Sequence, residues 1–189
     1  MLIKYEELYD IAKSKLSKER FNHTIGVVNR AIEYAQIYKV DEEIVKITAL
    51  AHDIAKELSK EEEQEIINKY NIKLDEIELI NHSLLHAIIG SYICQNEYGF
   101  NDDMTNAVRY HTTGRSNMSI LEKIIYLADA TEEGREFLKQ EYVDLIKTNI
   151  DLGMIEVLKD TIDKLASLKK VIHLDTITCY NYYVIKKGK

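Results

Sequence analysis

The sequence contains no proline among its 189 residues and only seven glycines. Both residue types interrupt helices, so their scarcity favours helix along nearly the whole chain. The plentiful Leu, Ile, Glu, Lys and Ala residues point the same way. The expected fold class is therefore all-α, a helical bundle. A chain of 189 residues suits one domain, residues 1–189, with a sizeable core.

Cysteine and long apolar runs are also scarce. Cys94 and Cys179 are too few and too irregularly placed for a disulfide framework or a zinc cluster. No apolar run approaches the length needed to span a membrane. The first nine residues mix charged with apolar side chains, unlike a signal peptide. A soluble, cytoplasmic protein is expected.

Positive charge is not in excess, because the formal net charge is −7. This argues against a nucleic-acid polymer as the main partner, since such a partner requires a basic stripe. A small phosphorylated ligand is compatible with the charge, because a few local Lys and Arg residues can hold phosphates in an acidic protein.

What the sequence does contain is a pair of adjacent metal-capable residues, His52 and Asp53, within a helix predicted over residues 44–58. Polar groups are costly in such an apolar pattern unless they are paired or bound to an ion. Imidazole with carboxylate suits divalent iron, manganese, zinc or nickel, whereas calcium prefers oxygen alone. Adjacent helical residues point about 100° apart, so further ligands must come from neighbouring helices.

Other residues able to bind a metal lie on other predicted helices. His23 sits at the edge of an apolar stripe, where a lone histidine is more typically a hydrogen-bonded core residue. His86 is flanked by apolar residues and is expected to be buried, while His111 closes a helix. Asp129 ends an apolar stretch, where an unpaired carboxylate would be expensive unless it binds a metal. His82 precedes His86 by four residues, a metal-binding spacing that is also a common coincidence in a chain with six histidines.

Several cationic and hydroxyl groups suit an anionic ligand. Lys56 follows Asp53 by three residues and can reach the same region, although a surface lysine explains the spacing equally well. The loop Thr112-Thr113-Gly114-Arg115 offers hydroxyls, free backbone and a guanidinium for phosphate, with a glycine C-cap as the alternative. Residues 173–178 open the last helix and include polar groups that suit an anion there, although helix capping alone would explain Asp175 and Thr176.

Helix boundaries follow from local signals. Ser59 with Glu62 and Ser119 with Glu122 have the spacing of capping boxes. Residues 141–170 show an amphipathic helical pattern, with a break expected at Gly153.

In their order along the chain, His23, His52-Asp53 and Asp129 resemble the signature of HD-domain metal-dependent phosphohydrolases. His86 and His111 lie between the doublet and the last aspartate. Over about residues 17–183 the chain is similar to the bacterial symmetrical diadenosine tetraphosphatases, or bis(5'-nucleosyl)-tetraphosphatases, of this superfamily. The segments that carry this similarity are Leu84-Leu85-His86-Ala87, Tyr110-His111-Thr112-Thr113-Gly114-Arg115, Tyr126-Leu127-Ala128-Asp129 and residues 173–178. The chain departs from the family at Glu132-Glu133-Gly134-Arg135, where an acidic residue is usually followed by proline before the arginine.

The resemblance implies an HD-domain helical bundle with a di-iron centre that cleaves diadenosine tetraphosphate into two ADP. It implies that His23, His52, Asp53 and Asp129 hold one metal, and that Asp53 bridges to a second held by His86 and His111. Asp53, His86, His111 and Lys56 are the predicted catalytic residues. The predicted substrate contacts are His23, Asp53, Ile54, Ala55, Lys56, His86, Thr112, Thr113, Arg115, Asp129, Arg135, His173, Leu174, Asp175, Thr176, Ile177 and Thr178. A homodimer is left open.

The ligand set also predicts the chemistry. Two cations that share a carboxylate lower the pKa of a bound water from about 15.7 towards neutrality, which gives hydroxide as the nucleophile. Lys56, Arg115 and Arg135 are expected to hold the remaining charge of a polyphosphate. One alternative is another HD-domain phosphohydrolase acting on a nucleotide monophosphate, a deoxynucleoside triphosphate or guanosine tetraphosphate. The other is a non-catalytic nucleotide sensor.

Overall fold

The computed structural model describes residues 1–135 and 139–187, apart from the side chain of His82. Over these residues the chain forms helices and no strand, which confirms the all-α prediction. The helices are α1 (Tyr5–Lys15), α2 (Lys18–Tyr38), α3 (Glu42–Ala51), α4 (Lys60–Tyr70), α5 (Glu76–Ile80), α6 (His82–Glu97), α7 (Asp102–Arg109), α8 (Ile120–Thr131), α9 (Gln140–Thr148), α10 (Ile150–Ser167) and α11 (Leu174–Lys187).

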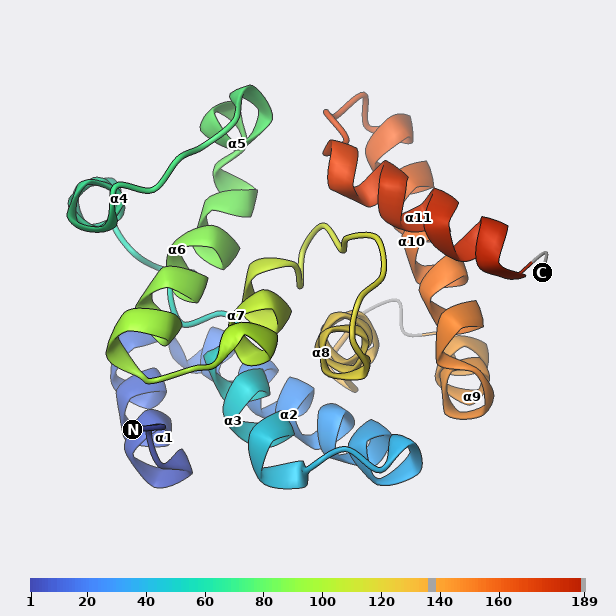
Figure 1. Cartoon of the computed structure of the whole chain (residues 1–189), viewed down its shortest axis with the longest axis horizontal. Helices are drawn as coiled ribbons and strands as arrows, with labels where there is room; N and C mark the ends of the chain where they lie inside the picture. The colour runs from blue at the N-terminus through green and yellow to red at the C-terminus, as the bar shows by residue number, and fades with distance from the viewer. Residues whose placement is uncertain (136–138, 188–189) are drawn as a thin grey trace.

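Helix α8 lies at the centre of the bundle, and every residue from Leu121 to Ala128 is buried. Figure 1 shows it end-on, between α7 and the pair α9 and α10, with α2 and α3 beneath, and close contacts join it to all five. A helix that is apolar nearly all round is stable only when other helices enclose it. Its enclosed position carries Asp129, near its C-terminal end, towards α2 and the end of α3.

Helix α3 is enclosed by α1, α2, α7 and α8, as its apolar sequence predicts. It ends at Ala51, however, so the prediction that it continues to residue 58 is wrong. Residues 52–57 instead form tight turns in which Ile54 N–H donates to the Ala51 carbonyl (3.1 Å) and Lys56 N–H to the Asp53 carbonyl (2.9 Å). His52 and Asp53 therefore lie on a tightened turn, and their side chains are not held at α-helical spacing.

The break in the long amphipathic pattern falls at Asn149, which corrects the prediction that it falls at Gly153. The Asn149 side chain caps α10 by accepting hydrogen bonds from the N–H groups of Asp151 and Leu152. Gly153 lies inside α10, where a Cβ atom would come within 2.4 Å of Ile146 Cγ1. The glycine therefore allows α10 to fold back closely on α9.

Gly153→Ala should lower the free energy of unfolding by about 1–3 kcal/mol, because the added methyl group overpacks against Ile146. In an open helix interior the same change normally stabilises by about 0.5–1 kcal/mol. Urea unfolding measures the difference. Gly90→Ala in α6 is the matched control, because a Cβ there meets nothing closer than 3.6 Å. A control as unstable as Gly153→Ala would contradict the overpacking explanation.

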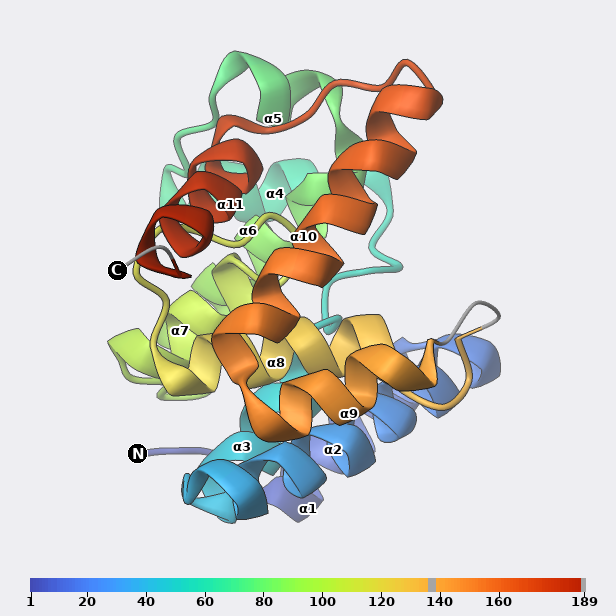
Figure 2. The ribbon, with the colours of Figure 1, turned by 90° about the vertical axis from the view of Figure 1, so that its right-hand side faces the viewer.

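Two groups of helices extend from this core: α4, α5 and α6 form one, and α10 and α11 form the other. Figure 2 shows α10 crossing α8, with α11 beside α10 and with α4, α5 and α6 behind them. Helix α11 is tied down at Asp151, which accepts hydrogen bonds from Lys186 (2.7 Å) and from the buried Lys123 of α8 (2.8 Å). At the far end, His173 Nε2 lies 3.2 Å from Asp75 Oδ2 and links the start of α11 to the start of α5. None of the helices in the described ranges is long and apolar enough to cross a membrane.

Candidate metal centre

The turn after α3 buries His52 completely and fixes the orientation of its ring. His52 Nδ1 lies 2.6 Å from the Ala49 carbonyl, so this nitrogen is the donor and Nε2 keeps its lone pair. His111 has the same arrangement at the end of α7, with Nδ1 2.7 Å from the Val108 carbonyl. A hydrogen bond from the far ring nitrogen is how proteins orient metal-binding histidines.

The two carboxylate oxygens of Asp53 face different histidines. Oδ2 lies 3.5 Å from His52 Nε2 and 3.9 Å from His23 Nε2. Oδ1 lies 3.0 Å from His86 Nε2 and 3.6 Å from His111 Nε2. A carboxylate placed between two pairs of imidazoles is suited to bridge two ions.

Asp129 completes the group on one side of Asp53. Its Oδ1 lies 3.1 Å from His23 Nε2 and 4.0 Å from His52 Nε2. The donor atoms of His23, His52 and Asp129 all lie within 4.8 Å of one another, and so do those of His52, Asp53 and His111. The six residues predicted as ligands therefore meet in one cluster, although they come from α2, α6, α8 and the ends of α3 and α7.

The polar atoms in this cluster fit divalent cations. His23 Nε2, His52 Nε2 and Asp53 Oδ1 are buried and form no well-aligned hydrogen bond with any described residue, although Asp129 lies beside the first and His86 beside the last. Buried polar atoms without partners are rare and costly, and a bond to a metal ion removes that cost. Nitrogen and carboxylate donors without thiolate suit first-row metals such as iron, manganese or zinc.

Electrostatics favour the protonation states that bind metals. Burial by itself raises the pKa of Asp53, but the imidazoles of His52, His111 and His86 outweigh burial and lower it below its usual value. Burial lowers the pKa of His52 and takes that of His86 to about 4. At neutral pH the cluster therefore presents an ionised carboxylate and neutral imidazoles at these positions, the forms that coordinate cations. His23 differs, because the Asp129 carboxylate outweighs burial and raises its pKa.

Three cationic side chains surround the cluster. Arg20 Nη1 lies 3.0 Å from Asp53 Oδ2, and Lys56 Nζ lies 3.8 Å from Asp53 Oδ1 and 3.1 Å from His86 Nε2. The guanidinium of Arg135 pairs with the Asp129 carboxylate and donates from Nε to the Asp129 carbonyl at 2.8 Å. Lys56 and Arg135 lie where the sequence predicts them. Arg20 was missed, although it precedes His23 by three residues and so shares its helix face.

Glu132 is a second residue that the sequence analysis missed. It is buried, its Oε1 lies 3.1 Å from His23 Nδ1, and its Oε2 accepts a hydrogen bond from Gly134 N–H at 2.6 Å. A carboxylate on the far nitrogen of a histidine fixes the ring orientation, as it does for many metal-binding histidines. The same contact closes the turn at Gly134, so Arg135 reaches Asp129 without the proline usual in the family. Glu132 stands at the acidic position of that motif.

Arg115 lies in a different environment from the one predicted. Its Nε and Nη2 pair with the two carboxylate oxygens of Glu122 at 2.6 and 2.9 Å, and Glu122 is fully buried. Binding phosphate through this same edge would require the guanidinium to leave a buried carboxylate, which is costly to leave unpaired. A phosphate contact at Arg115 stays a prediction.

Arg115→Ala should lower the free energy of unfolding by about 1–3 kcal/mol, because it leaves the buried Glu122 carboxylate with only local partners. Urea unfolding, measured together with KM and metal content, separates this structural role from phosphate binding. Arg115→Lys is the matched control, since it keeps the charge but not the two-pronged contact. A variant of normal stability with a raised KM would favour phosphate binding.

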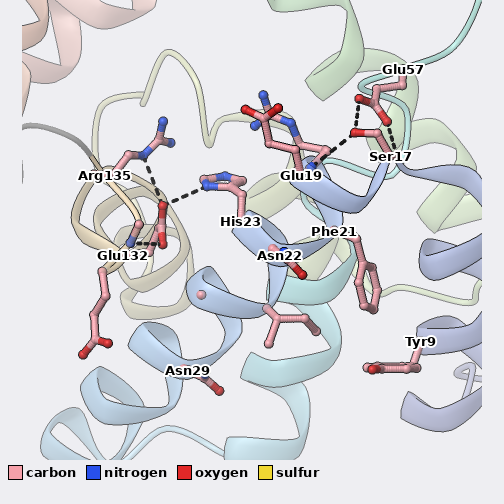
Figure 3. A pocket seen from close by; sticks show the side chains of 15 residues that line it. Tyr9, Ser17, Glu19, Phe21, Asn22, His23, Asn29, Glu57, Glu132 and Arg135 are labelled. Carbon is pink, nitrogen blue, oxygen red and sulfur yellow. Dashed lines mark hydrogen bonds and ion pairs between the residues drawn. The ribbon is translucent and has the colours of Figure 1, made fainter.

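Two cavities border the cluster. The first, here the His111 cavity, has a volume of about 690 Å³ and includes Asn81, Leu84, His111, Thr112, Thr113, Tyr126, Asp129, Arg135, His173 and Thr176 among its lining residues. The second, here the His23 cavity, has a volume of about 910 Å³ and is lined by Tyr9, Ser17, Glu19, Arg20, Phe21, Asn22, His23, Ile25, Gly26, Asn29, Glu57, Glu132, Glu133, Gly134 and Arg135 (Figure 3).

Some predicted substrate contacts lie outside both cavities. Ile54 and Ala55 are buried core residues of the turn, and Leu174 is exposed. Asp175, Ile177 and Thr178 lie in the first turns of α11 but do not line the His111 cavity. Contacts from these residues stay predictions. The side chain of His82 falls outside the described residues, so its metal-binding spacing to His86 also stays a prediction.

Comparisons with known proteins match most of the chain. The family model described as HD domain matches residues 20–134, a range that contains all six predicted ligands. The symmetrical bis(5'-nucleosyl)-tetraphosphatase of Halalkalibacterium halodurans is 37% identical over 94% of this chain and 95% of its own length. The enzyme of that name from Bacillus subtilis is 37% identical over 95% and 97%. A crystal structure from Clostridium acetobutylicum, described as a predicted HD superfamily hydrolase involved in NAD metabolism, superposes with a TM-score of 0.92 at 33% identity and covers 98% of this chain and 100% of its own.

Proposed function

This chain belongs to the HD-domain family, and from that premise we propose that it is a metal-dependent hydrolase that cleaves diadenosine tetraphosphate symmetrically into two ADP. The observation that carries the proposal is the position of Asp53, whose two oxygens face two separate pairs of histidines. Relatives matched over almost their full length bear the name of symmetrical tetraphosphatases, which supports this substrate.

The residues fit a pair of divalent cations, which we propose to be iron. His23, His52 and Asp129 would hold one ion, His86 and His111 the other, and Asp53 would join them. When bound, such a pair supplies a water of lowered pKa and neutralises charge on the phosphoryl oxygens. Imidazole and carboxylate donors accept iron readily, and the resemblance to a di-iron family supports that choice among first-row metals.

The side chains around the cluster would bind the substrate and stabilise its negative charge. Arg20, Lys56 and Arg135 bind and orient the polyphosphate, because each lies beside Asp53 or Asp129, whose negative charge the cations would neutralise when bound. Preorganised positive charge of this kind stabilises the charge that develops on phosphoryl oxygens. Lys56, placed 3.1 Å from His86, lies where it can stabilise the negative charge of a departing ADP.

Product analysis tests the proposal. The metal-loaded protein is incubated with diadenosine tetraphosphate and the nucleotides are separated by chromatography. ADP as the sole product supports symmetrical cleavage, whereas AMP with ATP indicates asymmetric cleavage. Tight binding without turnover indicates a nucleotide sensor. Faster turnover of a nucleotide monophosphate, a deoxynucleoside triphosphate or guanosine tetraphosphate would assign the chain to another HD-domain activity.

We further propose that residues 1–189 act as one unit in the cytoplasm. The flanking elements support this, because α1 packs on α3, and both α9 and α10 pack on α8, so helices outside the matched range contact helices within it. A small nucleotide substrate is consistent with the cytoplasmic location expected from the sequence.

A further inference from the structure

The His23 cavity and the His111 cavity border the same ligand cluster through different residues. Arg20 and His23 line only the first, His111 and Asp129 line only the second, and Arg135 lines both. The metal centre therefore lies between two cavities, of about 910 and 690 Å³. Each falls within the roughly 300–1,000 Å³ typical of small-molecule sites, so each is large enough for half of a dinucleotide.

The His23 cavity changes character along its length, as Figure 3 shows. Its end at the cluster carries His23, Arg20 and Arg135, which suit phosphate. Its other end carries Phe21 and Tyr9, whose rings meet edge to face with their centroids 5.1 Å apart. Aromatic side chains provide surfaces on which nucleic-acid bases stack. Phosphate groups at one end and an aromatic surface at the other match the two ends of a nucleotide.

Other polar groups of the lining suit a nucleoside. Asn22 and Asn29 are exposed amides on α2 that can bind the edge of a base. The wall also includes Glu19 and Glu133, which would repel additional phosphates but can accept hydrogen bonds from ribose hydroxyls. Glu57 and Glu132 also line the cavity, but they are bound to Ser17 and to His23 with Gly134. The acidic wall therefore favours a neutral nucleoside over further phosphates beside it.

We propose that the His23 cavity binds the second nucleoside diphosphate half of the substrate, while the His111 cavity holds the first. This inference rests on the proposed function. It explains symmetrical cleavage, because a centre between two cavities that each take a nucleoside and two phosphates meets the bond between the second and third phosphates. Arg135, which lines both cavities, lies where it can contact the phosphates on either side of that bond.

The test compares two substrates that differ only in the second nucleoside, diadenosine tetraphosphate and adenosine 5'-tetraphosphate. Phe21→Leu removes the aromatic face and keeps apolar bulk against Tyr9. It should lower kcat/KM about 10-fold for the dinucleotide, mainly through KM, and leave the mononucleotide within about 2-fold. Phe21→Tyr, which keeps a ring, should restore the dinucleotide value. Tyr92→Leu is the matched control, because Tyr92 stacks on Tyr70 outside both cavities.

A second variant guards against an effect on folding. Asn29 is exposed on α2 and lines the cavity, so Asn29→Trp should fill the cavity without disturbing the core. The same selective loss of the dinucleotide is expected. Equal losses for the two substrates, in either variant, would overturn the inference.

Binding of ADP gives a readout that does not depend on turnover. Calorimetric titration of the metal-loaded protein should detect two ADP per chain, and Asn29→Trp should bind one. A single ADP on the unaltered protein would overturn the second subsite even if diadenosine tetraphosphate is cleaved. Two ADP on a protein that does not cleave diadenosine tetraphosphate would instead refute the proposed function and leave two nucleotide sites standing.

Discussion

Asp53→Ala should leave the protein without its metal pair and reduce turnover of diadenosine tetraphosphate by about 10³-fold or more. The physical reason is that both oxygens of Asp53 are used, Oδ2 towards His52 and His23 and Oδ1 towards His86 and His111. Without that carboxylate, the two ions lose the negative charge that lies between them. Metal content per chain, measured by elemental analysis alongside the product assay, checks both effects.

The control for Asp53→Ala is Asp163→Ala. Asp163 is an aspartate that pairs with Lys159 on the surface of α10 and lines neither cavity of the metal centre. Its replacement should leave metal content and turnover unchanged. Asp53→Ala protein that still holds two ions per chain would disprove the bridging role.

His86→Ala should reduce the metal content from two ions per chain to one and lower turnover by about 10²-fold or more. His86 faces only the Oδ1 side of Asp53, so its loss weakens one of the two positions and leaves His23, His52 and Asp129 in place. Elemental analysis after dialysis measures the change. Loss of both ions together would mean that the two positions form only as a unit.

The matched control for His86→Ala is His173→Ala. His173 is also buried and lies near two carboxylates, Asp75 at 3.2 Å and Glu78 at 3.9 Å. These carboxylates already cap α5, and Glu78 also pairs with Arg109. His173→Ala should therefore keep both ions, although it alters the wall of the His111 cavity. A fall in metal content would place a further ion at the start of α5.

Local signals correctly predicted where α4 and α8 begin, because the interactions that start a helix are short-range. The capping boxes at Ser59 and Ser119 are present in the structure. The two boundary errors have different causes. The turn after Ala51 lets His52 and Asp53 face distant helices, whereas the break falls at Asn149 because its side chain caps α10, and Gly153 lies within that helix against Ile146.

The sequence by itself determined the fold class and the identity of the candidate ligands. Composition and apolar periodicity act along the chain, and the order of His23, His52-Asp53, His86, His111 and Asp129 can be read without coordinates. Both signals are therefore present in the sequence itself.

Only the tertiary structure decided which side chains contact these ligands. Arg20 reaches Asp53 across 33 positions, and His23 reaches Glu132 across 109. These pairings depend on which helix faces enclose α8, and the burial of many apolar side chains sets that packing jointly. The division of the Asp53 carboxylate between two pairs of histidines, and the position of the cluster between two cavities, follow from the same packing.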